Sequence, residues 1–78
     1  RRSNRKVGIM TPMQRAECRY LKWEVDSDLV KHGSSLIVAE DEMVRTAMVQ
    51  FYRMEGFEVS VSEDQRSFTV RPKPPVQF

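Results

Sequence analysis

The sequence predicts an α+β fold in which two helices pack on one face of a small three-stranded sheet, in the order α-β-α-β-β. Three observations lead to this prediction. Apolar residues recur with helical spacing in two segments, a short β-branched run lies between them, and strict alternation follows the second segment. The chain has 78 residues, which suffices for one domain with a single small core.

The first helix is expected to begin at Thr11. Threonine is a good N-cap, the proline that follows it fits the first helical position, and Gln14 is placed to complete a capping box. A less regular apolar stripe then continues to His32, and Gly33 suits a C-terminal cap. We expect one long helix, or a helix that frays near residues 26–28.

A first strand and a second helix are predicted next. Leu36 to Val38 form a short β-branched run, and the acidic tripeptide 40–42 suits a helix N-terminus because carboxylates there face the positive end of the helix dipole. Apolar residues at 43, 44, 47, 48, 51 and 54 then share one helical face. Gly56 is suited to end this helix, since glycine adopts the left-handed conformation at little cost.

The remaining residues predict a β-hairpin. Apolar and polar residues alternate in 57–62 and again in 67–71, with a turn at Glu63 to Gln65. The prolines beyond Arg71 lack an N–H, so they cannot extend a strand ladder. We therefore divide the chain into a basic N-terminal arm (1–10), one α+β domain (11–72) and a Pro-rich tail (73–78), which is compatible with a polyproline ligand or a linker.

Aromatic side chains supply much of the expected core. Tyr20, Trp23, Phe51 and Tyr52 are predicted to pack the helices onto the sheet. The alternative for Tyr20 and Trp23 is that their rings stack on the bases of a single-stranded nucleic acid.

The charges are segregated along the chain although the net charge is only +2. Residues 1–22 hold seven cations against Glu17 alone, residues 23–64 hold ten carboxylates against three cations, and the last fourteen residues hold three cations and no acid. Two basic ends of this kind favour contact with a phosphate backbone, with an affinity that falls as salt rises. A solvated basic tail explains the same N-terminal residues without a ligand.

The sequence offers little for catalysis or metal binding. Cys18 is the only cysteine and His32 the only histidine, so no intramolecular disulfide and no dense Cys/His metal site is expected. A nucleophile formed by Cys18 with His32 is the alternative to a small helical side chain and a helix-terminal cation. We expect no enzyme activity, no cofactor and no small-molecule substrate.

The same composition bears on location. No apolar run reaches the roughly 20 residues needed to cross a bilayer, so no membrane partner is expected. A single free cysteine indicates a reducing, intracellular compartment, either nucleus or cytoplasm. The chain begins with arginine and is expected to belong to a larger protein.

Several features together resemble the R-3-H (Arg-xxx-His) family of single-stranded nucleic-acid-binding domains. Arg45 occupies the arginine position near the start of the second helix, and Gly56 and Phe57 match the helix stop. Residues 60–62 match the serine-containing strand end, and 66–70 match the last strand. The resemblance covers about 55 residues and implies the fold predicted above. Three residues separate Arg45 from Val49, which stands where the family has histidine, so the signature pair is half absent.

Residues 36–64 also resemble the opening strand, acidic pocket, first helix and second strand of a phosphorelay receiver domain. That likeness is local, because only fourteen residues follow Asp64, none of them is Asp, and no parallel β-α repeat follows. A magnesium site at Glu40, Asp41 and Glu42 is the corresponding alternative to a capped helix start.

The function predicted from the sequence is a non-enzymatic module that binds single-stranded RNA or DNA. Guanidinium groups suit phosphate because their planar forks grip it in two places. The alternative is a protein-interaction or regulatory domain that uses its acidic helix surface and an open sheet edge. The candidate nucleic-acid-binding residues are Arg45, Arg66, Arg71, Lys73, Arg1, Arg2, Arg5 and Lys6.

Overall fold

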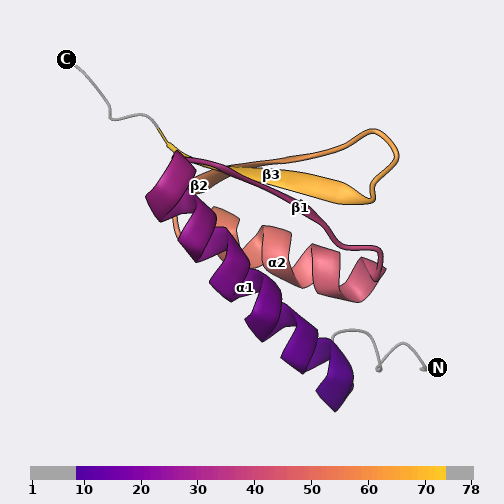
Figure 1. Cartoon of the computed structure of the whole chain (residues 1–78). Helices are drawn as coiled ribbons and strands as arrows, with labels where there is room; N and C mark the ends of the chain where they lie inside the picture. Colours follow the sequence, from indigo (N-terminus) through magenta and orange to yellow (C-terminus); the bar gives the residue numbers. More distant parts are fainter. Residues whose placement is uncertain (1–8, 74–78) are drawn as a thin grey trace.

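The computed structural model describes residues 9–73, which form two helices and a three-stranded antiparallel sheet (Figure 1). The elements are α1 (Pro12–His32), β1 (Ser35–Val38), α2 (Glu42–Met54), β2 (Phe57–Val61) and β3 (Ser67–Pro72). The strand order is β1-β3-β2, and both helices lie on the same side of the sheet (Figure 1). The predicted fold class and element order are confirmed. An antiparallel sheet also differs from the parallel sheet that a receiver domain requires.

Both ends of α1 are fixed by the residues that predicted them. The Thr11 hydroxyl accepts the Gln14 N–H at 3.1 Å, and the Gln14 side-chain oxygen accepts the Thr11 N–H at 2.9 Å, which completes the capping box. Gly33 has φ 84°, and its N–H donates to the Leu29 carbonyl at 3.1 Å. The helix is continuous, so the alternative of a frayed middle is not observed.

The acidic tripeptide is the start of α2. Asp41 is the N-cap, and one of its carboxylate oxygens accepts the N–H groups of Met43 and Val44 at 2.9 and 3.1 Å. Its other oxygen accepts from the Gln14 side-chain amide at 3.0 Å, which joins the N-termini of the two helices. These hydrogen bonds lower the pKa of Asp41, the one from Gln14 most.

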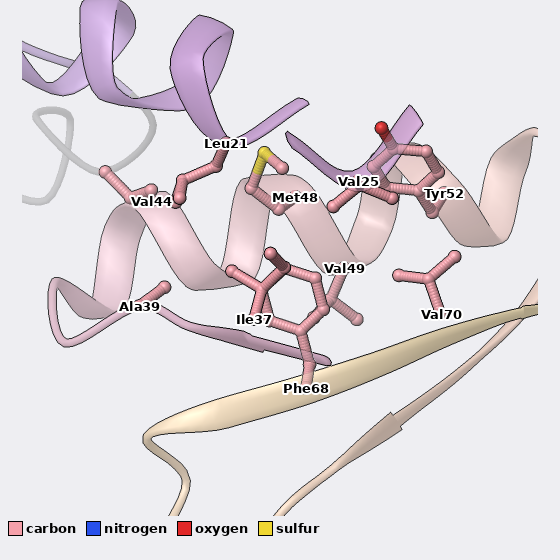
Figure 2. Close-up of a cluster of buried hydrophobic side chains, with 10 residues drawn as sticks. All are labelled: Leu21, Val25, Ile37, Ala39, Val44, Met48, Val49, Tyr52, Phe68 and Val70. Atoms are coloured by element: carbon pink, nitrogen blue, oxygen red, sulfur yellow. The ribbon is translucent and has the colours of Figure 1, made fainter. Parts of the chain in front are cut away.

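The core lies between the helices and the sheet (Figure 2). Ten buried apolar residues come from all elements except β2: Leu21, Val25, Ile37, Ala39, Val44, Met48, Val49, Tyr52, Phe68 and Val70. Phe57 and Val59 of β2 pack against this cluster while partly exposed. Gly56, with φ 97°, turns the chain from α2 into β2 as predicted.

The predicted role of the aromatic residues is wrong for three of four. Tyr52 is buried, but Tyr20, Trp23 and Phe51 are 60%, 69% and 39% exposed. On α1 the inward face is occupied by Leu21 and Val25 instead. Because 3.6 residues make one turn, Tyr20 and Trp23 then point to the opposite side of the helix.

The hairpin has the predicted turn, but β3 is longer than expected. Pro72 is its last residue and lies opposite Phe57 of β2, so the ladder includes the first proline rather than ending before it. A proline is tolerated at this terminal position, where one N–H is dispensable. Residues 1–8 of the predicted arm and 74–78 of the predicted tail lie outside the described residues.

Candidate nucleic-acid interface

Two of the predicted site residues, Arg45 and Arg66, are connected through one buried residue. The Arg45 guanidinium donates from Nη1 to the Ala39 carbonyl at 2.7 Å. The Ala39 N–H in turn donates to the Arg66 carbonyl at 2.8 Å. Ala39 is fully buried between β1 and α2, so its backbone gives both arginines a rigid anchor.

The β2–β3 turn holds Arg66 in place. The Gln65 N–H donates to the Ser62 carbonyl at 2.9 Å, and the Ser67 N–H donates to the Ser62 hydroxyl at 3.1 Å. The Asp64 carboxylate accepts from the Ser62 hydroxyl and from the Arg66 backbone N–H. These two hydrogen bonds, the serine one most, lower the pKa of Asp64. The Asp64 carboxylate thus stabilises the turn. Within the same turn Gln65 adopts a left-handed backbone conformation, with φ 59°.

An open hollow of about 310 Å³ lies between α2 and this turn. Six of the eight residues that line it have polar or charged side chains; the lining consists of Glu42, Arg45, Thr46, Val49, Gln50, Arg53, Val61 and Gln65. Arg53, which was not among the predicted site residues, donates to the Val59 carbonyl at 3.0 Å. The signal that points to it is its spacing, because residues 45, 49 and 53 lie on successive turns of one helical face.

The other predicted cations are not part of this hollow. Arg71 pairs with Glu58 in the strand register and is five residues from Arg66 along β3, or about 16 Å at the usual rise of a strand. Lys73 is exposed just beyond the end of β3. Arg1, Arg2, Arg5 and Lys6 lie outside the described residues.

The arginines of the hollow have no carboxylate partner among the described residues. In residues 9–73 the single ion pair joins Lys22 to Asp26 at 2.9 Å. Glu42 contributes a negative charge to the lining without coming within 4 Å of a cation in this part of the chain. The guanidinium groups of Arg45 and Arg53, which line the hollow, therefore keep donors for an anionic ligand, and Arg66 adjoins Gln65 of the lining.

A second basic surface lies between the two helices, and the sequence did not point to it. A groove of about 370 Å³ has an apolar floor and a basic rim: Met10, Arg15, Cys18, Arg19, Lys22, Ala47, Met48 and Phe51. Lys22 Nζ lies 5.4 Å from the Phe51 ring centroid, and Arg15 Nη1 donates to the Met10 carbonyl at 2.8 Å. Residues of two separate elements build this groove, so spacing along the sequence does not reveal it.

Cys18 faces this groove as a partly buried thiol. Burial raises its pKa, and the negative charges of Glu17 and Asp41 raise it further, which disfavours the nucleophilic thiolate. Cys18 and His32 lie fourteen residues apart on the same helix, or about 21 Å. They do not form a nucleophile–base pair.

The comparisons with known proteins add no relative. No protein-family model, curated protein or solved structure matches the chain. Within residues 9–73 no helix is both long and apolar enough to cross a membrane, and no three His, Cys, Asp or Glu side chains are grouped so as to hold a metal ion.

Proposed function

We propose that this chain is a non-enzymatic module that binds single-stranded RNA or DNA at the end of the domain where α2 meets the β2–β3 turn. The observation that carries the proposal is that Arg45 and Arg53 line one hollow without an ion-pair partner in residues 9–73, with Arg66 next to Gln65 of the same lining. Planar guanidinium groups bind phosphate through two parallel hydrogen bonds, and such charge-assisted bonds are about twice as strong as neutral ones.

The shape and chemistry of the hollow favour a single strand over a duplex. Gln50, Gln65 and Thr46 supply both donors and acceptors beside the arginines. Bases expose their hydrogen-bonding edges only when they are unpaired, so amide side chains in a hollow of this size suit one splayed nucleotide better than a rigid helix. Arg71 and Lys73 are then secondary phosphate contacts farther along β3.

The resemblance to R-3-H domains supports the same proposal, since the element order and the place of Arg45 at the start of α2 agree with it. The chain differs from the R-3-H signature at one residue, because Val49 stands at the histidine position. Val49 is buried and also lines the hollow, so it contributes shape rather than a charge or a hydrogen bond.

Fluorescence anisotropy with labelled single-stranded RNA and DNA oligonucleotides tests the proposal. Three guanidinium–phosphate contacts predict a slope of log affinity against log salt of about −2, and Arg45→Ala should weaken binding roughly tenfold to a hundredfold. Arg45→Lys keeps the charge but loses the fork, so it should bind with intermediate affinity. Lys31→Ala removes one exposed cation from the far end of α1 and is the matched control, with less than a twofold effect expected.

Three outcomes would overturn the proposal. One is no binding at low salt by any variant. Another is binding that is lost only when residues 1–6 are deleted, because the folded domain would then not be the part that binds the nucleic acid. The third is a larger loss of affinity with Arg19→Ala than with Arg45→Ala, which would place the binding site in the groove between the helices.

One observation favours a protein-interaction module as the second candidate. Strand β1 lies at an edge of the sheet and exposes Leu36 and Val38 on the face that the helices leave open. An exposed edge with apolar side chains can accept a strand from a partner. Such binding should be nearly independent of salt, whereas phosphate binding is not.

A further inference from the structure

Helix α1 carries a second apolar stripe on the side that faces away from the domain. Along it apolar and small residues recur at alternating spacings of three and four, at Met13, Ala16, Tyr20, Trp23, Ser27 and Val30. Met13 and Val30 are 82% and 86% exposed, and the two aromatic rings between them are more than half exposed. The stripe extends over nearly the whole helix, which makes it a continuous surface rather than a few scattered side chains.

The domain cannot cover this stripe. The inward face of α1 is formed by Leu21 and Val25, with Cys18 and Leu29 at its margins. At about 100° per residue, the centres of the two stripes are roughly 160° apart around the helix axis. The outer side of α1 is therefore open to a partner, and the sheet and α2 lie behind it.

The spacing is that of a coiled-coil seam. A repeat of seven places residues 13, 20 and 27 at position a, and residues 16, 23 and 30 at position d. Small side chains at Ala16 and Ser27 alternate with the large ones. Trp23, Ser27 and Val30 line an open hollow of about 350 Å³ that could receive a side chain of a facing helix.

The charges beside the stripe select the partner. Positions g hold Arg19 and Asp26, and positions e hold Glu17, Glu24 and Lys31. In a parallel pair of identical helices, position g of one helix meets position e of the next heptad of the other. Arg19 then faces Glu24 of the second copy on both sides of the seam, and these charges are complementary. Asp26 lies level with Lys31 of the second copy, but its carboxylate already accepts from Lys22 and Tyr52 of its own chain, so the selection rests on Arg19 and Glu24.

An antiparallel pair is disfavoured by the same residues. With a facing d, Arg19 would still meet Asp26 of the second copy, but Glu17 would meet Glu24 on both sides. Like charges at such positions destabilise the pair. We infer that this protein forms a parallel homodimer through the outer face of α1.

The dimer is expected to be weak and reversible. The seam has six core positions in a helix of 21 residues, and Tyr20 and Trp23 together expose roughly 300 Å² for burial. An interface of this size is at the small end of specific interfaces, so we expect a dissociation constant on the order of 10–100 μM for the dimer. The stripe does not include the arginines of the hollow, and the inference is independent of nucleic-acid binding.

Sedimentation equilibrium of the full chain between about 5 and 500 μM tests the dimer. The weight-average mass should rise from the monomer mass of 9.2 kDa toward twice that value. Val30→Glu should shift the dissociation constant at least tenfold upward, whereas Met54→Glu, at an equally exposed apolar site on α2, should leave it unchanged. Circular dichroism checks that both variants are folded.

Charge exchange and cross-linking test the parallel arrangement. Glu24→Arg should weaken the dimer, and adding Arg19→Glu to it should restore the original dissociation constant. Ser27→Cys in a Cys18→Ser background should form an intermolecular disulfide, because identical a positions meet only when the helices are parallel. A monomer at 500 μM, an equal effect of Met54→Glu, failure of the charge exchange or absence of the disulfide would each overturn the inference.

Discussion

The hydrogen bond of the buried Tyr52 hydroxyl tests how the two helices are held together. Tyr52 donates to an Asp26 carboxylate oxygen at 2.9 Å and lies 3.3 Å from the Lys22 carbonyl, which connects α2 to the middle of α1. Its ring makes edge-on contacts with Phe51 and Phe57, with centroids 5.0 and 5.7 Å apart. Tyr52→Phe removes the hydroxyl and leaves these ring contacts in place.

The expected loss is about 1 kcal/mol of unfolding free energy. A hydrogen bond to a charged group contributes about 1.5–3 kcal/mol, but the Asp26 side chain is 49% exposed and water replaces part of what it loses. For a domain of this size, 1 kcal/mol corresponds to roughly 4–8 °C in Tm. Urea denaturation followed by circular dichroism measures the change, with the m-value unaltered.

A double-mutant cycle with Asp26→Ala isolates the pair. The coupling free energy between the two substitutions should be close to the full effect of Tyr52→Phe. If the two substitutions are additive within about 0.3 kcal/mol, the hydrogen bond does not stabilise the fold and the reasoning fails.

The same residue makes stability depend on alkaline pH. Burial raises the pKa of Tyr52, and the hydrogen bond to Asp26 and the charges of Asp26 and Glu55 raise it further. Above pH 10 the unfolded chain loses this proton while the native chain keeps it, so the native state binds more protons and stability falls as pH rises. The stability difference between wild type and Tyr52→Phe should therefore shrink between pH 9 and 11. A constant difference would contradict this assignment.

Three further predictions concern the helix ends. Thr11→Ala removes the N-cap of α1 and should lower the unfolding free energy by about 1 kcal/mol in urea titrations, whereas Thr11→Ser should not. The lowered pKa of Asp41 gives stability that is present above pH 3.8 and lost as pH falls through its native pKa, so Asp41→Asn, which still caps, should flatten the acid limb of the stability profile. Gly33→Ala should cost about 1 kcal/mol in thermal melts because φ is 84° there, while Ser34→Ala, with no such backbone requirement, serves as its control.

The elements were predictable because their signals are local. Thr11, Asp41 and Gly33 act on backbone groups within four residues, so the sequence alone places them. The end of β3 was missed by one residue, since a proline forbids a donor and not an extended backbone.

Which face of α1 turns inward was not predictable in the same way. The sequence shows one irregular apolar stripe, from which Tyr20 and Trp23 were expected to enter the core; the structure divides it into an inner and an outer stripe and places both aromatic residues on the outer one. The core between α1 and the sheet contains the large side chains of Phe68 and Tyr52, and from α1 it is completed by Leu21 and Val25 rather than by Trp23. Such volume matching depends on all elements together, and a periodic pattern does not contain it.

The residues of the candidate site also divide into those that the sequence predicted and those that depend on contacts between elements. Arg45 and Arg66, both predicted site residues, hydrogen-bond to the same buried residue, Ala39, Arg45 through its guanidinium and Arg66 through its backbone carbonyl. Arg53 was missed because its relation to the site arises from the hairpin, whose Val59 carbonyl orients its guanidinium.

Arg53 also lies close to Val49, which stands where the R-3-H pattern has histidine. In the R-3-H pattern the partner of the arginine lies one helical turn after it, which is Val49 here, and this residue is packed into the core. An imidazole at that depth would need a hydrogen-bond partner, whereas valine needs none. The next residue on the same face is Arg53, one turn farther on, and it lines the same hollow. Under the proposed function Arg53 supplies a second cation to this hollow, and Arg53→Ala should weaken nucleic-acid binding about as much as Arg45→Ala.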